Sequence, residues 1–226
     1  MSELCLWCAN PLRPNLSLTF LLSGREYTPP RLCRRCQELF IPPVGSQCPQ
    51  CGRFQAESVP CRDCQEWKKR SGVPLVNQAV YPYHGIMQSY LERYKFQGDY
   101  VLRWLVKQRL ERCLQHKQEL IIPIPITATQ RKQRKFNQVE GWLTEVVWVA
   151  ALVARPRAIS QHQQTRAQRL QTREPFTLNE QVLDQLQGSH VCLVDDVYTT
   201  GQTLHEAQRL LLSNGVQTVR SVTLAR

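Results

Sequence analysis

Residues 191–204, VCLVDDVYTTGQTL, join a short apolar run to two adjacent carboxylates and then to a turn of threonine and glycine. The apolar run predicts a buried strand over residues 190–195, and the amphipathic residues after the turn predict a helix over 202–214. Ligands of open α/β sheets lie beyond the carboxyl ends of the strands, so we expect the chemistry of this chain in the turn. In the simpler interpretation these residues form only a strand, a loop and a helix capped by Thr200 or Thr203.

The turn has the groups that bind a phosphate. Several backbone N–H groups, threonine hydroxyls and the start of a helix can converge on one anion. Gly201 permits a close approach of the backbone to a ligand. Asp195 and Asp196 raise each other's pKa and are costly to bury together, so we expect them to face solvent, a cation or sugar hydroxyls.

Strands and helices alternate along residues 71–226. A polar stretch without carboxylates, residues 155–173, interrupts them. The alternation predicts an α/β domain with a mainly parallel sheet flanked by helices. The periodicity places strands at 76–83, 120–126 and 216–226, a helix over 85–114 interrupted near Gly98, and a helix running into a strand over 136–154.

The cysteines predict metal binding in a separate module, residues 1–70. Four Cys-x-x-Cys pairs suit two tetrahedral zinc ions in a double zinc-ribbon-like fold, closed by four thiolates each. This module shows no sustained helical period. Sequential grouping of the pairs is the simplest assignment, and interleaved pairing stays open. Cys192 lies in an apolar strand and is expected to be buried and inert. The predicted zinc ligands are Cys5, Cys8, Cys33, Cys36, Cys48, Cys51, Cys61 and Cys64.

The formal net charge of +11 belongs mainly to residues 71–226. Residues 1–70 hold ten Lys and Arg against six Asp and Glu, and the rest holds nineteen against twelve. Two filled zinc sites would add about −4 to the first part and leave it near neutral. A basic cluster follows the apolar strand at 120–126, and it predicts a second anion site. The cluster consists of Arg131, Lys132, Arg134 and Lys135.

The run around the two carboxylates closely resembles the signature by which type I phosphoribosyltransferases bind 5-phosphoribosyl-1-pyrophosphate (PRPP). The resemblance implies the phosphoribosyltransferase fold for residues 71–226. It also implies that Asp195 and Asp196 contact the ribose, with Mg²⁺ nearby in some members. Arg131 and Arg134 are then candidates for the pyrophosphate. The resemblance assigns the 5-phosphate to Thr199, Thr200, Gly201, Gln202 and Thr203.

Three further segments, together with the cysteine pairs, resemble the ComF family of bacterial DNA uptake: RKFNQVEG, YLERYKFQGDYVL and RAQRLQTREPF. Lys135 stands where that family usually has glycine. The resemblance implies a competence protein that supports entry of single-stranded DNA during natural transformation, binds PRPP, and partners a ComFA-like ATP-driven helicase/translocase. The alternative is an active phosphoribosyltransferase acting on a base or an amine. None of the five histidines has a partner pattern typical of a general base.

The segment from Arg93 to Lys135 predicts contact with single-stranded DNA. It contains eleven Lys and Arg against three acids, and charge with interleaved aromatic rings suits a groove that follows a single strand. Trp104 is equally explained as part of a helix's core face. No run of about eighteen apolar residues and no signal-like start occur, so we expect a cytoplasmic protein without membrane insertion. The aromatic candidates are Tyr94, Phe96, Tyr100, Trp104 and Phe136.

Overall fold

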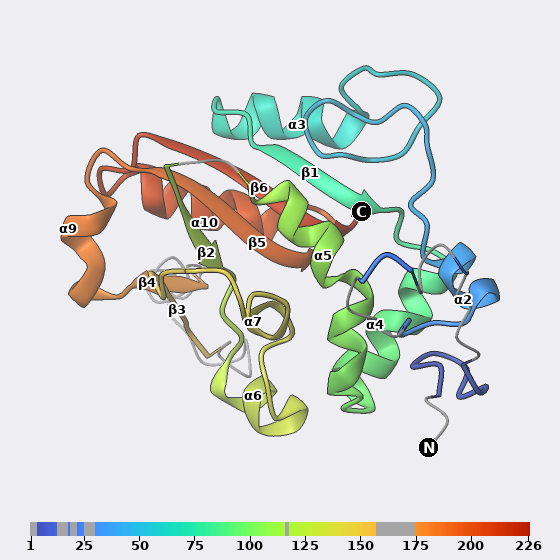
Figure 1. The fold of residues 1–226 in the computed structure, drawn as a ribbon. Helices are drawn as coiled ribbons and strands as arrows, with labels where there is room; N and C mark the ends of the chain where they lie inside the picture. Colours follow the sequence, from blue (N-terminus) through green and yellow to red (C-terminus); the bar gives the residue numbers. More distant parts are fainter. Residues whose placement is uncertain (1–3, 13–17, 19–21, 25–29, 116–117, 157–174) are drawn as a thin grey trace, which may run out of the picture.

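The computed structural model describes residues 4–12, 18, 22–24, 30–115, 118–156 and 175–226. Its centre is a four-stranded sheet in the order β1-β6-β5-β2, in which all neighbouring strands run parallel (Figure 1). The prediction of a mainly parallel α/β sheet is therefore confirmed. The strands are β1 (Val76–Tyr81), β2 (Glu119–Pro123), β5 (His190–Val197) and β6 (Thr218–Ala225).

The sheet has a separate apolar layer on each face, because side chains alternate along a strand. On β5, Cys192 and Val194 join the core under α4 (Ile86–Phe96), α5 (Arg103–Cys113) and α7 (Gln138–Trp142). Val191 and Leu193 join the core on the opposite face, under α10 (Gln202–Leu212). The hairpin of β3 (Leu152–Ala154) and β4 (Phe176–Leu178) packs on that second face. Helices thus cover both faces of the sheet, as parallel strands require.

Several element boundaries differ from the sequence-based ones. The helical stretch predicted over 85–114 is divided at Gly98 into α4, the 3₁₀ turn η1 (Tyr100–Leu102) and α5. The helix predicted from residue 136 has only five residues, because α7 ends at Trp142 and the chain runs on without regular structure to β3. Residues 157–173 of the polar stretch lie outside the described residues. The remaining elements are α6 (Ala128–Arg134), η2 (Glu180–Val182) and α9 (Leu183–Leu186).

The cysteine-rich segment contains more helix than its sequence indicates. Besides α2 (Arg34–Leu39), it holds the ten-residue helix α3 (Arg62–Ser71), whose N-cap is Cys61. The sequence shows no sustained helical period here, yet the Cys61/Cys64 pair opens a ten-residue helix. Gly72 ends α3 in the left-handed conformation, and three basic residues of the last turn interact favourably with the helix dipole.

The cysteine-rich segment packs against both faces of the sheet. Cys5 and Cys36 lie in the core beneath α4 and α5, with Phe40 fully enclosed beside them. Cys48 and Cys51 lie in the core of the opposite face, together with Leu75. In Figure 1 this part of the chain runs from α2, beside α4, to α3, beside β1. The division of the chain into domains at residue 70 stays a prediction.

Lys135 occupies a backbone conformation that favours glycine. It is the C-cap of α6 with φ of 69°, and its N–H donates to the carbonyl of Arg131. A left-handed residue of this kind ends many helices, and any side chain other than that of glycine is strained there by about 1 kcal/mol. Glycine, which the motif resembled by RKFNQVEG has at this position, adopts this conformation without strain.

Replacing Lys135 with glycine should stabilise the protein. We expect Lys135→Gly to raise the free energy of unfolding by about 0.5–1 kcal/mol, because strain is removed from an exposed position. Urea unfolding of the two proteins measures the difference. The matched control is Lys135→Ala, which removes the charge but keeps the Cβ. If the alanine variant is as stable as the glycine variant, the left-handed backbone is not the cause.

Candidate ligand site and metal centres

The turn after β5 is built around a glycine that no other residue can replace without rearrangement. Gly201 has φ of 82° and is the N-cap of α10. A Cβ on Gly201 would lie 2.2 Å from the hydroxyl of Tyr198, which is buried beneath it. Neither Thr200 nor Thr203 is the N-cap, so the cap assignment of the simpler interpretation is wrong. The hydroxyl oxygen of Thr200 accepts only a long hydrogen bond, 3.4 Å, from the amide of Gln202.

The amides of this turn are available to a ligand. Within the described part of the chain, the N–H groups of Thr199, Thr200 and Gly201 have no acceptor, whereas the N–H of Tyr198 donates to Ala225 of β6. Thr199 and Thr200 are exposed. The partial positive charge of the N-terminus of α10 adds to the three unused donors. Together they form the kind of concave donor group that binds phosphate.

The two carboxylates at the end of β5 face different groups. Asp196 forms an ion pair with Lys95 of α4, with 2.7 Å between Nζ and Oδ2. The same oxygen accepts from the side-chain amide of Gln138, the first residue of α7. Of the partners expected for the acids, Asp196 therefore has a cation. Asp195 accepts a hydrogen bond from the backbone N–H of Asp196 at 2.8 Å.

Burial and the neighbouring charge of Asp196 raise the pKa of Asp195 from 3.8 to about 8. Lys95 and Arg134 act in the opposite direction without cancelling these effects. The acid of Asp195 is thus predominantly protonated at neutral pH in the free protein, while Asp196 is paired with an ammonium group. A protonated carboxyl group can donate to a polyol, and a carboxylate in an ion pair can still accept from one.

Lys95 and Gln138 are site residues that sequence reasoning missed. Both lie inside segments that carry the family resemblance, YLERYKFQGDYVL and RKFNQVEG, but neither segment indicates which side chain meets Asp196. The sequence therefore marked the two segments as motifs but did not show that Lys95 and Gln138 contact Asp196. Only the packing of α4 and α7 on one face of β5 brings the three side chains together.

The other residues predicted to bind anions are not all close to the two carboxylates. Arg134 donates to Gln138 Oε1 at 3.0 Å, so one side chain separates it from Asp196. Arg131 is exposed and forms an ion pair with Glu140 at 2.8 Å. Gln202 is turned along α10 toward Glu206, and Thr203 is half-buried in the first turn of that helix. The structure therefore brings Arg134 to the carboxylates, while Arg131 is held by another acid.

Replacing Asp195 with asparagine should change how stability depends on pH. A carboxyl group whose pKa is raised on folding contributes most stability below its unfolded pKa, near 4, and loses it as the pH rises through about 8. We expect Asp195→Asn and the wild type to melt alike near pH 4–5, and the variant to melt higher at about pH 9. Thermal melts of ligand-free protein across this range test it. Asp184→Asn, at an exposed position on α9, is the control; a difference independent of pH would contradict the shifted pKa of Asp195.

The eight paired cysteines form two groups of four, in the order of the sequence. Within each group the sulfur atoms all lie within 4.8 Å of one another. Recorded Sγ–Sγ distances are 3.8 Å for Cys8 and Cys33, and 3.7 Å for Cys48 and Cys64. A tetrahedral zinc ion with Zn–S bonds of about 2.3 Å separates its sulfurs by about 3.8 Å. Both groups therefore fit zinc, and interleaved pairing is excluded. The groups are Cys5, Cys8, Cys33 and Cys36, and Cys48, Cys51, Cys61 and Cys64.

The second cysteine group has hydrogen bonds that suit thiolate ligands. The backbone N–H of Cys61 donates to Cys48 Sγ at 3.3 Å, and Arg226 donates to Cys51 Sγ at 3.4 Å. Hydrogen bonding from Cys64 and the cationic Arg226 lower the pKa of Cys51 to about 4 against the effect of burial. Cys192 is fully buried, and burial raises its pKa to about 12, as expected for an inert thiol.

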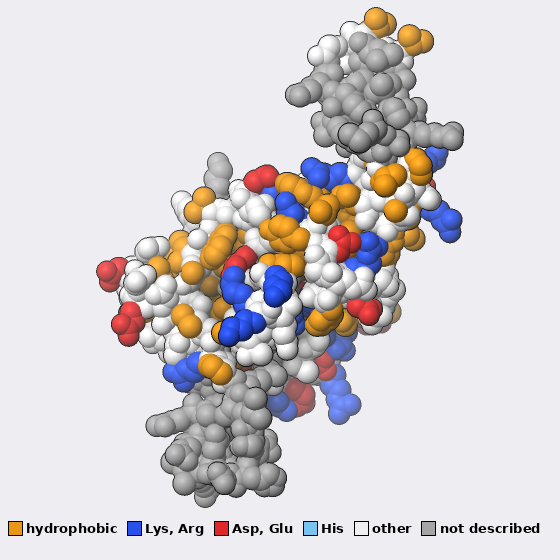
Figure 2. Space-filling model, turned by 90° about the horizontal axis from the view of Figure 1, so that it is seen from below, with side chains coloured by type: hydrophobic (Ala, Val, Ile, Leu, Met, Phe, Trp, Pro, Cys, Tyr) orange, Lys and Arg blue, Asp and Glu red, His pale blue; other side chains and the backbone are white. Residues whose placement is uncertain are grey.

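Arginine side chains stack on aromatic rings in and between α4 and α5. Three aromatic residues each lie under a guanidinium group: Arg134 over Phe96 at 5.3 Å, Arg103 over Tyr100 at 4.1 Å, and Arg31 over Trp104 at 4.2 Å. We call these six residues the aromatic–arginine strip. Figure 2, which views the molecule from the α6 side, shows Lys and Arg side chains gathered near the middle of this face, with hydrophobic ones beside them.

Not every aromatic residue named from the sequence belongs to the aromatic–arginine strip. Phe96 is 70% exposed and Tyr100 is 36% exposed. Tyr94 is fully buried and stacks on Trp142, so it cannot contact a nucleic acid base. Phe136 is half-buried between Tyr94 and Tyr100. Among the described residues, no helix combines the length and apolar character needed to cross a bilayer.

Known proteins are similar in sequence to nearly the whole of this chain. The phosphoribosyl transferase domain family matches residues 107–226. Competence protein ComFC of Streptococcus pneumoniae is 30% identical over 98% of this chain and 99% of its own length. The chain belongs to the ComF family. ComFC of Bacillus subtilis is likewise 30% identical, over 99% of this ComF chain and 95% of its own length.

Enterobacterial proteins are similar over a smaller part of the chain. The DNA utilization protein YhgH of Salmonella typhimurium is 29% identical over 80% of this chain and 84% of its own. Among solved structures, the allosteric regulatory enzyme of purine biosynthesis resembles 55% of this ComF chain and 26% of its own chain, with a TM-score of 0.39 and 17% identity. A similarity of that size carries no inference about function.

Proposed function

We propose that this ComF protein binds PRPP at the turn between β5 and α10, binds single-stranded DNA along the aromatic–arginine strip, and supports DNA uptake. The observation that carries the PRPP assignment is the combination of three unused amides at the start of α10 with two carboxyl groups just before them. Relatives over the full length are named competence proteins, and others are named DNA utilization proteins.

Each part of PRPP has a matching group in this arrangement. The 5-phosphate suits the amides of Thr199, Thr200 and Gly201, with the threonine hydroxyls and Gln202 at the rim. The ribose hydroxyls suit Asp195 and Asp196, one acid protonated and the other paired with Lys95. The pyrophosphate suits Arg134, which already lies beside Gln138, and Arg131 on release from Glu140. Mg²⁺ with the ligand would offset the remaining negative charge.

Removing one carboxylate charge should weaken PRPP binding without unfolding the protein. We expect Asp196→Asn to lower the affinity for PRPP roughly tenfold or more, since hydrogen bonds to charged groups contribute about 1.5–3 kcal/mol. Isothermal titration calorimetry of the variant beside wild type measures this, with melting temperatures to confirm folding. The matched control is Glu180→Gln, at an exposed acid of η2. Equal binding heats in all three proteins would refute the site.

The DNA assignment rests on the exposed rings and their guanidinium groups. Stacking of a base on an aromatic ring contributes about 1–3 kcal/mol without sequence preference, and arginines neutralise the phosphates. Phe96 and Tyr100 offer such rings near Arg134 and Arg103. Arg134 belongs to this strip and donates to Gln138, which in turn donates to Asp196, so a bound single strand and a bound PRPP would be neighbours.

Phe96→Ala should reduce the affinity for single-stranded DNA about fivefold or more, because one stacking platform is lost. Fluorescence anisotropy with a labelled oligothymidine, repeated over a series of salt concentrations, measures it. The logarithm of the affinity should fall with log salt with a slope of about −0.7 per phosphate contacted. Val44→Ala, which removes a fully exposed hydrophobic side chain outside the strip, is the control. A nearly flat salt dependence, or equal losses in both variants, would contradict the assignment.

Both cysteine groups are proposed to hold zinc with a structural role. Four thiolate ligands leave no open position for substrate, so the ions would stabilise a segment in which, among the described residues, Leu12, Leu32 and Phe40 are the buried apolar side chains besides cysteine. We further propose a ComFA-like ATP-driven translocase as the protein partner and the cytoplasm as the location.

The second candidate function is an active phosphoribosyltransferase that transfers ribose 5-phosphate to a base or an amine. The match of residues 107–226 to the phosphoribosyl transferase domain favours it. Pyrophosphate release with a panel of bases and amines distinguishes the two functions. Sustained turnover that Asp196→Asn abolishes would establish the enzyme. Binding of PRPP without turnover would favour the first function, a protein that binds PRPP and DNA without catalysis.

A further inference from the structure

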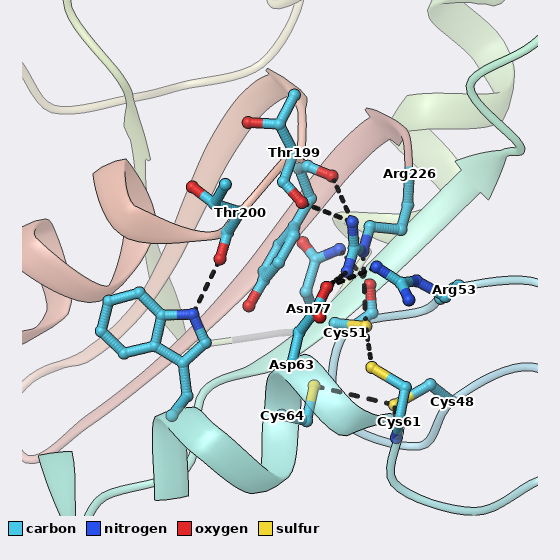
Figure 3. Close-up of polar contacts among 12 residues, drawn as sticks. Cys48, Cys51, Arg53, Cys61, Asp63, Cys64, Asn77, Thr199, Thr200 and Arg226 are labelled. Atoms are coloured by element: carbon cyan, nitrogen blue, oxygen red, sulfur yellow. Dashed lines mark hydrogen bonds and ion pairs between the residues drawn. The ribbon is translucent and has the colours of Figure 1, made fainter. Parts of the chain in front are cut away.

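Three carbonyl groups of the β5–α10 turn accept hydrogen bonds from two side chains, Arg226 and Trp67, that lie beside the second cysteine group. The carbonyls of Tyr198 and Thr199 both accept from Nη1 of Arg226, the first at 3.1 Å. The carbonyl of Thr200 accepts from the indole N–H of Trp67 in α3 at 2.7 Å. Figure 3 shows the carbonyls of Thr199 and Thr200 directed toward these two side chains.

Holding these carbonyls also sets the direction of the amides. In a trans peptide the C=O of one residue and the N–H of the next point to opposite sides of the chain. The three carbonyls therefore direct the N–H groups of Thr199, Thr200 and Gly201 away from Arg226 and Trp67. These are the same three amides that have no acceptor within the described residues. Side chains behind the turn thus orient its donors before any ligand binds.

Arg226 connects the turn directly to the second cysteine group. Its side chain is only 6% exposed. Besides the two carbonyls, its guanidinium donates to Cys51 Sγ at 3.4 Å and to Asp63 Oδ2 at 3.0 Å. Asp63 lies between Cys61 and Cys64 in the sequence and also accepts from Arg53. One planar, five-donor group therefore contacts a predicted zinc ligand, the start of α3 beside two further predicted ligands, and the turn proposed to bind phosphate.

Trp67 makes the second connection. It lies three residues after Cys64 on α3, so the position of the indole depends on the helix that the cysteine pair opens. The indole stacks on His205 of α10, with ring centroids 4.0 Å apart and 13° between the ring planes. It is therefore fixed from both sides, by the cysteine-bearing helix and by the helix that begins at the turn.

We propose that Arg226 and Trp67 are positioning residues that orient the turn amides toward a phosphate, and that metal in the Cys48–Cys64 group and PRPP at the turn consequently strengthen each other's binding. This inference rests on the proposed PRPP site and adds how that site is controlled. With the metal bound, Cys51, Asp63 and α3 are held in place, and so are the donors to the three carbonyls. Loss of metal from this group releases them together.

The test compares PRPP affinity among variants whose metal content has been measured. Trp67→Phe keeps a ring to stack on His205 but removes the N–H donor, and we expect a loss of roughly threefold to tenfold, the effect of one hydrogen bond. Arg226→Lys keeps the charge but cannot reach both carbonyls, Asp63 and Cys51 at once, so we expect a loss of roughly tenfold or more. The control is Trp148→Phe. The indole N–H of Trp148 has no acceptor among the described residues, so this variant should bind PRPP as tightly as wild type.

Reciprocity gives a readout that does not depend on PRPP affinity alone. If metal strengthens PRPP binding by a given factor, PRPP strengthens metal binding by the same factor. PRPP should therefore raise the chelator concentration needed to strip zinc from wild type, and do so less in Trp67→Phe. If Trp67→Phe and Arg226→Lys retain metal and bind PRPP as tightly as wild type while Asp196→Asn does not, the positioning role is refuted and the PRPP site stands.

Failure of wild type to bind PRPP would instead refute the proposed function. The positioning role is then decided by the carbonyl ¹³C resonances of Tyr198, Thr199 and Thr200, which report hydrogen bonds accepted by these groups. Removal of metal should shift all three, and Trp67→Phe should shift mainly Thr200. Resonances that respond to neither change would refute the coupling.

Discussion

The planar trans peptide is the constraint on which the candidate site depends. An amide can be offered to an anion on one side of a turn only if its carbonyl partner is satisfied on the other. In this protein the carbonyls of Tyr198, Thr199 and Thr200 are satisfied by Arg226 and Trp67. The donors are thus oriented in advance, and a ligand need not reorganise the turn in order to bind.

The buried cysteines form part of the hydrophobic core on both faces of the sheet. Cys5 and Cys36 are buried against the helix layer of α4 and α5, and Cys48 and Cys51 against the opposite layer. Metal sites on both faces would connect the N-terminal segment to the sheet, where few of its described large apolar side chains are buried. The polar contacts of Arg226 then extend the second site to the ligand turn.

The charges at the site are arranged so that no acid is buried without compensation. Asp196 is paired with Lys95 and hydrogen-bonded by Gln138, while Asp195 has a pKa raised to about 8 and is mainly neutral. Two adjacent carboxylates at the end of one buried strand are tolerated in this way. The same arrangement leaves one donor and one acceptor available to a sugar.

The sequence by itself determined the parallel α/β class, the strand that carries Asp195 and Asp196 near its end, the turn around Gly201, and the cysteine pairs whose spacing suits a metal. These features depend on periodicity and on spacings of a few residues, which a single chain displays directly. The cysteine grouping, the buried position of Tyr94, the left-handed Lys135 and the partners Lys95, Gln138, Trp67 and Arg226 were decided only by the tertiary structure. Contacts such as that between Trp67 and Thr200 join residues 133 positions apart. They arise from the packing of helices on a sheet, and no local pattern specifies which distant side chains that packing brings together.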